Sequence, residues 1–213
     1  MWSELSLPWQ AALEEAWSAS CAGCVPIGAV VVNENGDIIA RGRNHINDRE
    51  ALPGQICGNQ LAHAEINALL AVTRPHEEFH HLAIYTTMEP CPLCMGAIYM
   101  SGIRRLYYAC RDTYAGSADM LKSTPYLSRK PIKAFSPQSS DLENILAAIQ
   151  TEYRLVRFSG QNSFVQEAWR RVCPQGVALG ERLAGSQELL AMRKVCCPVA
   201  EVIDWLESRY LQN

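Results

Sequence analysis

Segments with the periodicity of strands and of helices alternate along the first three quarters of the chain, and this alternation limits the fold more than any other feature. An apolar, partly β-branched run at Val25–Val32 meets a polar turn, and Ile38–Arg43 returns as a second strand, which is the pattern of a hairpin. Strand-like and helix-like segments then follow in turn up to about residue 158. The pattern predicts an α/β sandwich with helices on both faces of one sheet.

The remaining elements are predicted from the same periodicities. Helices are expected at Leu7–Ser20, Leu61–Val72 and Pro92–Ser101, and from a cap at residues 139–141 to Tyr153. Further strands are expected at Leu82–Thr87, Arg105–Cys110 and Ile132–Phe135. Long polar loops are expected at Asn44–Asn59 and Asp112–Lys130.

The last quarter of the chain has a helical pattern of its own. We therefore predict two domains, an α/β domain at 1–158 and a helical C-terminal extension at 159–213. Helices of the extension are expected at Phe164–Val172, Glu188–Lys194 and Val199–Tyr210. The breaks between them are assigned to Pro174, Gly176, Gly180 and Gly185.

Composition and charge exclude several classes of protein. With 213 residues, 48% of them hydrophobic, the chain can bury one sizeable core. A formal charge of -3 disfavours a large nucleic-acid footprint, which needs a basic surplus. No apolar stretch approaches the roughly 20 residues of a membrane span, and no signal peptide is recognised, so we expect a cytoplasmic protein without a membrane partner. Nine cysteines are then interpreted as thiols and metal ligands.

Two short motifs carry most of the functional information. His-Ala-Glu at 63–65 lies early in a predicted helix, and Pro-Cys-Pro-Leu-Cys at 90–94 lies where a strand meets a helix. Cysteines three apart at a helix start can direct both sulfur atoms to one metal ion, and zinc favours thiolate and imidazole ligands. The positive end of a helix also favours the thiolate form of cysteine. We predict that His63, Cys91 and Cys94 bind one zinc ion per chain.

This ligand set leaves the fourth position of a tetrahedral zinc ion open. A structural zinc site is usually closed by four protein ligands, whereas a catalytic site keeps one position for water. Zinc lowers the pKa of that water to about 7, so we expect a bound water or hydroxide. Glu65 lies two residues from His63 and is the predicted catalytic residue, which takes the water's proton and returns protons to the substrate.

Each motif has other interpretations when it stands alone. His-x-Glu is common by chance, and Cys-x-x-Cys also occurs as half of a structural zinc site, as a redox pair or as two buried thiols. Together, in this order and with a strand between them, the motifs are far more specific. They match the pattern of the zinc deaminases, in which His-x-Glu precedes Pro-Cys-x-x-Cys. The sequence therefore predicts a zinc-dependent hydrolase that cleaves an amidine-type C–N bond.

At these residues the chain resembles the cytidine deaminase superfamily, and more narrowly the branch of tRNA adenosine deaminases and bacterial guanine deaminases. The resemblance covers roughly residues 7–153. It is carried by VPIGAVVV at 25–32, by Asn44, by AHAEINAL at 62–69 and by TMEPCPLCMGAI at 87–98. It implies a cytidine deaminase-like three-layer α/β/α sandwich with a five-stranded mixed sheet, and it implies a homodimer.

Candidate substrate contacts come partly from this resemblance and partly from the residue types near the motifs and in the loops. It implies that Asn44 hydrogen-bonds the substrate, although Asn is also an ordinary turn residue. An aromatic loop residue can stack on a base, and a loop carboxylate can accept from an N–H group, but anchoring and solvation are the respective alternatives. The candidate contacts are Asn44, His45, Ala64, Pro90, Tyr114 and Asp119.

A second group of cysteines has two interpretations. Cys21 and Cys24 are also three residues apart, and with Cys196 and Cys197 they would suffice for a second metal site. Cysteine is, however, among the most often buried residue types, so core thiols are the preferred interpretation.

Three functions follow from these motifs. The first is deamination of a small nucleobase or nucleoside, purine more than pyrimidine. The second is deamination of the wobble adenosine of tRNA, which is less favoured because three scattered dibasic pairs make a weak RNA-binding surface. The third is a catalytically silent, zinc-stabilised interaction module, which leaves the acid at position 65 without a purpose.

Overall fold

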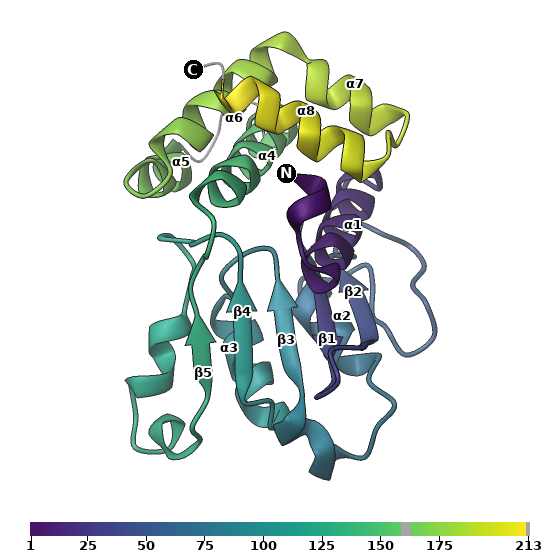
Figure 1. The fold of residues 1–213 in the computed structure, drawn as a ribbon, viewed down its shortest axis with the longest axis vertical. Coiled ribbons are helices and arrows are strands. Elements are labelled where there is room, and N and C mark those ends of the chain that lie inside the picture. The colour runs from purple at the N-terminus through teal and green to yellow at the C-terminus, as the bar shows by residue number, and fades with distance from the viewer. Residues whose placement is uncertain (159–162, 212–213) are drawn as a thin grey trace.

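A computed structural model describes residues 1–158 and 163–211, and its centre is one sheet with the strand order β2-β1-β3-β4-β5 (Figure 1). β1 is antiparallel to β2 and β3, whereas β3, β4 and β5 run parallel to one another. The sheet is therefore mixed and five-stranded, as predicted. The strands are β1 (Gly28–Val32), β2 (Ile38–Arg43), β3 (Ala83–Thr86), β4 (Arg105–Tyr108) and β5 (Lys133–Phe135).

Helices account for most of the remaining described residues, and none of those described combines the length and hydropathy that a membrane span requires. Four short 3₁₀ helices lie at Trp2–Glu4, His76–His81, Ala118–Lys122 and Leu127–Arg129, the last two inside a predicted loop. The α-helices are α1 (Leu7–Cys21), α2 (Ala64–Leu70), α3 (Pro92–Ser101), α4 (Ser140–Phe158), α5 (Ser163–Arg170), α6 (Pro174–Ser186), α7 (Glu188–Lys194) and α8 (Val199–Leu211).

The two faces of the sheet are covered by different helices. Alternate residues of β1 belong to two core clusters, one formed with α1 and one formed with α2 and α3. Two glycines let the helices approach closely. A Cβ on Gly28 would lie 2.2 Å from the Ala12 carbonyl oxygen of α1, and one on Gly42 would lie 2.2 Å from the Ala68 nitrogen of α2. Helices on both faces are thus confirmed, and α2 and α3 lie side by side on one of them.

The α2 helix begins later in the chain than the periodicity predicts. The expected helix at 61–72 starts only at Ala64, because His63 has extended dihedral angles and is the residue just before the helix. Cys91 has the same relation to α3, with Pro92 at the first helical position. Both predicted motifs therefore lie at helix starts, where unpaired N–H groups produce a positive potential.

The C-terminal extension contains a helix that the sequence analysis missed. The segment at 174–186 was expected to be broken, yet it forms α6, which packs along α4. Pro174 stands in the first turn, where a missing N–H costs nothing. A Cβ on Gly176 would lie 2.3 Å from the Asn144 carbonyl oxygen, and one on Gly180 would lie 2.6 Å from that of Ala148. These glycines are packing contacts between helices, so reading them as breaks was wrong.

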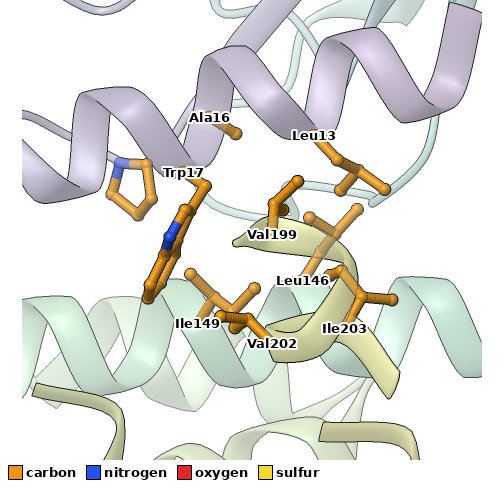
Figure 2. A pocket seen from close by; sticks show the side chains of 9 residues that line it. Leu13, Ala16, Trp17, Leu146, Ile149, Val199, Val202 and Ile203 are labelled. Atoms are coloured by element: carbon orange, nitrogen blue, oxygen red, sulfur yellow. The ribbon is translucent and has the colours of Figure 1, made fainter. Parts of the chain in front are cut away.

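The extension shares its core with the rest of the chain. Buried side chains of α1, α4, α5, α6 and α8 form one hydrophobic cluster. Where α1, α4 and α8 meet, nine apolar side chains leave a cavity of only about 10 Å³ (Figure 2). That space is no larger than a single water probe, so the interface is a packed core with no room for a ligand. The predicted boundary at 158/159 borders residues 159–162, which lie outside the described residues, and it stays a prediction.

Candidate metal and catalytic site

Three of the predicted site residues come together at the starts of α2 and α3. His63 and Cys91 directly precede these helices, and Cys94 lies in the first turn of α3. The Nδ1 atom of His63 is 3.5 Å from the Cys91 sulfur and 3.4 Å from the Cys94 sulfur. The three donor atoms all lie within 4.8 Å of one another. The three residues that the sequence singled out are therefore brought together, and their binding of a metal ion stays a prediction.

The geometry of this cluster fits zinc. With Zn–N near 2.05 Å and Zn–S near 2.3 Å, a tetrahedral ion separates its nitrogen and sulfur ligands by about 3.6 Å. The observed separations of 3.4 Å and 3.5 Å agree with that value. One imidazole and two thiolates are also the soft and borderline donors that zinc prefers. His63, Cys91 and Cys94 are thus suited to hold a zinc ion with one coordination position open.

The charge state of the cysteines also favours metal binding. Hydrogen bonds from the Cys94 thiol and from His63 lower the pKa of the Cys91 thiol to about 4, against the effect of its partial burial. The hydrogen bond with Cys91 in turn raises the pKa of His63. The pKa of Cys94 is raised, first by its hydrogen bond to Cys91 and then by burial. Cys91 is thus the more readily ionised of the two thiols.

Glu65 lies beside this cluster in a buried position. It is 3% exposed, and its Oε1 accepts a hydrogen bond from the Thr86 hydroxyl at 3.1 Å. Its Oε2 accepts from the Cys94 thiol at 3.3 Å. Burial raises the pKa of Glu65, which makes its carboxylate a better proton acceptor. A carboxyl group that is buried, next to a metal-ligand cluster and held by Thr86 from β3 is well placed for proton transfer.

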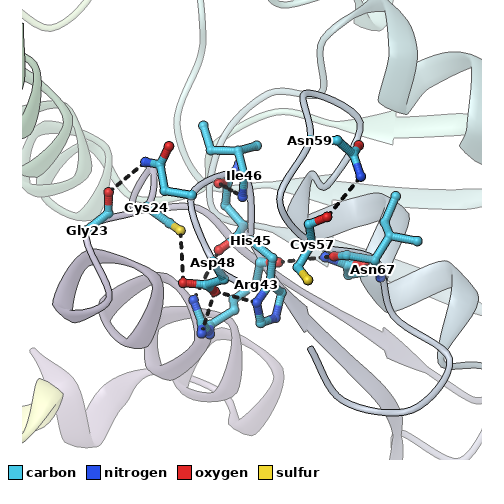
Figure 3. A network of polar contacts seen from close by, with 12 residues as sticks. Gly23, Cys24, Arg43, His45, Ile46, Asp48, Cys57, Asn59 and Asn67 are labelled. Carbon is cyan, nitrogen blue, oxygen red and sulfur yellow. Dashed lines mark hydrogen bonds and ion pairs between the residues drawn. The ribbon is translucent and has the colours of Figure 1, made fainter. Parts of the chain in front are cut away.

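The loop after β2 is held by its own polar network (Figure 3). The Nδ1 atom of His45 lies 2.6 Å from an Asp48 oxygen, which Arg43 also contacts at 2.8 Å. Asn44 is 2% exposed, and its side-chain oxygen accepts the Ile46 N–H at 3.2 Å. The loop joins the zinc-ligand region directly, because the His45 N–H donates to the carbonyl of the residue before His63. The substrate roles of Asn44 and His45 stay predictions.

The other candidate substrate contacts have different environments. The side chain of Ala64 is fully buried in the core under α2, so a contact with a substrate would have to come from its backbone. Pro90 is buried next to Cys91. Tyr114 is 56% exposed, with its ring centroid 5.2 Å from that of Phe164, and Asp119 is exposed. Substrate contacts by these residues also stay predictions.

Glu89 lies two residues before Cys91, and the sequence analysis gave it no separate role. Its carboxylate accepts hydrogen bonds from the backbone N–H groups of Asp112 and Ala118, each at 3.2 Å. It thereby closes the loop of residues 111–118 against the segment that carries Cys91. A Cβ on Gly116 would lie 2.5 Å from this carboxyl group. The sequence shows only that an acid directly precedes the Pro-Cys motif. Its need for hydrogen-bond partners follows from its partial burial, which the structure reveals.

The cysteines outside the site differ in burial: Cys24, Cys110 and Cys173 are buried, Cys21, Cys57 and Cys197 are partly buried, and Cys196 is exposed. Within 1–158 and 163–211, a second group of three ligand-type side chains is formed by Cys110, Glu143 and Cys173, all of them buried. Cys21, Cys24, Cys196 and Cys197 form no such group among these residues. Cys24 is fully buried, as the core-thiol interpretation predicted.

Comparison with known proteins identifies the family. The family described as the cytidine and deoxycytidylate deaminase zinc-binding region matches residues 4–110. The chain is 32% identical over 113 residues to the guanine deaminase of Bacillus subtilis, which covers 50% of this chain and 67% of that protein. It is 28% identical over 145 residues to the "Probable cytosine deaminase" of Schizosaccharomyces pombe, covering 61% of this chain and 82% of that protein.

A solved structure of a tRNA deaminase also resembles this chain in sequence and in fold. It comes from a study of A-to-I editing by tRNA deaminases at the wobble position of transfer RNA. It is 31% identical to this chain, covers 67% of this chain and 97% of its own, and superposes with a TM-score of 0.53. Fold, ligand cluster and comparisons together define a zinc-binding hydrolytic deaminase. The chain belongs to the cytidine and deoxycytidylate deaminase family.

Proposed function

We propose that this protein removes an amino group, as ammonia, from a small nucleobase or nucleoside, with purine-type bases preferred. One observation carries the proposal: a cluster of three metal donors, His63, Cys91 and Cys94, with the buried carboxyl group of Glu65 directly beside it. A purely structural zinc site would be closed by a fourth protein donor, and this group contains three. The catalytically silent module is therefore the weakest of the three hypotheses.

The roles of the residues follow from their positions. His63, Cys91 and Cys94 would hold zinc, which when bound supplies a water that is acidic near neutral pH. The Oε2 atom of Glu65 accepts the proton of the attacking water, because burial makes this carboxylate more basic. Glu65 delivers this proton to the ring nitrogen, then takes the proton of the hydroxyl group that has been added to the ring carbon and passes it to the departing amine, which leaves as ammonia. The Thr86 hydroxyl keeps the other oxygen, Oε1, oriented during this transfer.

The substrate class rests on charge and on the relatives. One relative is named as a guanine deaminase and one structure concerns adenosine in tRNA, and both of these bases are purines. A net charge of -3 disfavours a broad phosphate-binding surface, which supports a small substrate over an RNA. The second candidate, wobble adenosine of tRNA, is favoured by the match that covers 97% of the tRNA deaminase chain. Cytosine is a further candidate base, because the Schizosaccharomyces pombe relative is named as a probable cytosine deaminase.

Release of ammonia from a panel of substrates tests the proposal. The panel contains guanine, adenine, cytosine, their nucleosides, related aminopurines and unmodified tRNA, with Glu65→Ala as the control. We expect turnover of a free purine or nucleoside by the wild type and none by the variant, with equal zinc content in both. Turnover of tRNA alone would replace the proposal by its second candidate. Wild-type rates in Glu65→Ala would refute the proton-transfer role.

The homodimer is proposed on the resemblance alone. Size-exclusion chromatography with light scattering on the zinc-loaded protein tests it, and we expect a mass near twice 23.7 kDa. A monomer at micromolar concentration would contradict it.

A further inference from the structure

The loop of residues 111–118 lies against the zinc-ligand segment. The Ser117 N–H donates to the Pro90 carbonyl at 2.9 Å, one residue before Cys91. The Glu89 carboxylate accepts the N–H groups at both ends of the loop. The loop also carries Tyr114, a predicted substrate contact. A displacement of this loop would therefore disturb the segment that carries Cys91.

A side chain from the C-terminal extension holds the turn inside this loop. The indole N–H of Trp169, in α5, donates to the Asp112 Oδ1 atom at 2.8 Å. The same oxygen accepts the backbone N–H groups of Tyr114 at 2.9 Å and Ala115 at 3.0 Å. Trp169 is 4% exposed, and its hydrogen bond to the partly buried Asp112 carboxylate is itself partly buried. Such charge-assisted bonds are about twice as strong as neutral ones.

Further contacts join the same helix to the same loop. The Phe164 ring lies 5.2 Å from the Tyr114 ring. The guanidinium carbon of Arg154, in α4, lies 5.7 Å from the centre of the Trp169 ring, within cation–π range. Burial lowers the pKa of Arg154, and the nearby Asp112 carboxylate partly opposes that effect. Asp112 is therefore held by an indole N–H and balanced by a nearby positive charge.

We propose that Trp169 is a positioning residue of the deaminase site, acting through Asp112 to hold the 111–118 loop in its substrate-binding conformation. The family match ends at residue 110, so both the loop and its anchor lie beyond it. Substrate affinity in this protein thus depends on a helix of the C-terminal extension. The kinetic part of this inference rests on the proposed function, whereas the loop anchoring does not.

The test is the variant Trp169→Phe, which keeps an aromatic ring and removes the N–H donor. Trp17→Phe is the matched control, because Trp17 is 6% exposed and its N–H donates to the Cys197 carbonyl at 2.7 Å, away from the loop. In Trp169→Phe we expect KM for the best substrate to rise about 3- to 10-fold with kcat changed less than about twofold. Trp17→Phe should keep both constants within about twofold, whatever it does to thermal stability.

Amide hydrogen exchange gives a readout that needs no turnover. We expect amides 112–118 to exchange about tenfold faster in Trp169→Phe than in the wild type, with no change in Trp17→Phe and equal zinc content in all three proteins. Unchanged exchange and unchanged KM in Trp169→Phe would overturn the inference, as would the same KM rise in the control. A wild type that deaminates nothing would refute the proposed function, and hydrogen exchange would still decide the anchoring.

Discussion

The described part of the chain holds two clusters of three side chains of the types that bind metals. Both contain two cysteines, but they differ in burial and in the charge states of their members. His63, Cys91 and Cys94 lie at the starts of two helices, and two of the three are partly exposed. Cys110, Glu143 and Cys173 are buried between β4, α4 and α6, with exposed fractions of 1%, 4% and 1%. We call these the helix-start cluster and the core cluster.

The two clusters also differ in the charge states of their members. In the helix-start cluster, hydrogen bonds lower the pKa of Cys91 to about 4. In the core cluster, the hydrogen bond with Cys173 and complete burial raise the pKa of Cys110, which keeps the thiol neutral. Arg111 already donates three hydrogen bonds to the Glu143 carboxylate, from its backbone N–H, Nε and Nη2, at 2.7–3.0 Å. Cys94 of the helix-start cluster also has a raised pKa, so the contrast lies in Cys91, which is readily ionised, and in Glu143, which is already paired. We therefore expect zinc at the helix-start cluster and none at the core cluster.

The largest expected difference between the clusters is in zinc content. Cys91→Ser should reduce zinc from one per chain to near zero and abolish turnover, because serine at this position is a poor zinc ligand. Cys110→Ser should keep one zinc per chain. Elemental analysis of the purified proteins measures both. If Cys110→Ser lost its zinc while circular dichroism showed an intact fold, the core cluster would contribute to zinc binding, contrary to our assignment.

A large effect on turnover is expected at Glu65 without loss of metal. Glu65→Gln keeps the size of the side chain and removes its ability to accept a proton, so kcat should fall about 10²- to 10⁴-fold. Zinc content should stay at one per chain. Steady-state kinetics with elemental analysis on the same sample provides the measurement, and a decrease of less than tenfold would argue against proton transfer by this residue.

A moderate effect on stability is expected at the core cluster. Arg111→Met removes two of the three donors to a carboxyl group that is 4% exposed. The free energy of unfolding should fall by about 1–3 kcal/mol, since the arginine side chain is itself 43% exposed. Urea denaturation measures this change. The variant also tests the comparison, because binding of a second zinc ion would mean that only Arg111 had kept the core cluster from being a metal site.

The smallest effect is a difference in thiol reactivity in the metal-free protein. Because the pKa of Cys91 is lowered to about 4, its thiolate is already formed at neutral pH, and its alkylation rate should stay nearly flat between about pH 6 and about pH 8. An ordinary thiol would react roughly 100-fold faster at the higher pH. Cys110 should remain unlabelled because its pKa is raised and it is buried. Peptide mapping by mass spectrometry after iodoacetamide treatment distinguishes the two, and a steep rise at Cys91 would contradict the assignment.

Local sequence patterns were sufficient for the sheet and for bringing the three candidate metal ligands together. The β2 strand at Ile38–Arg43 and the α3 helix at Pro92–Ser101 have the predicted bounds, because periodicity, turns and Pro92 act over a few residues. The helix-start cluster was predictable for the same reason, since both motifs depend only on a nearby helix start.

Contacts between distant segments were not predictable in this way. Gly176 and Gly180 resemble helix breakers in the sequence, and only the close approach of α4 explains them as helical packing residues. Arg193, in α7, binds the fully buried Glu152 of α4 and the Ser20 hydroxyl of α1, at separations of 41 and 173 residues along the chain. No short pattern indicates such a pair.

The sequence by itself therefore determined the α/β class, the grouping of three metal-donor side chains and the neighbouring acid, because each depends on residue types at fixed short spacing. The tertiary structure alone decided how the extension contributes. It brought Trp169 to Asp112 across 57 residues, separated the helix-start cluster from the core cluster, and buried Glu65 beside Thr86. The physical reason is that burial and partner choice, which set pKa values and hold loops in place, depend on packing between segments that are far apart in the chain.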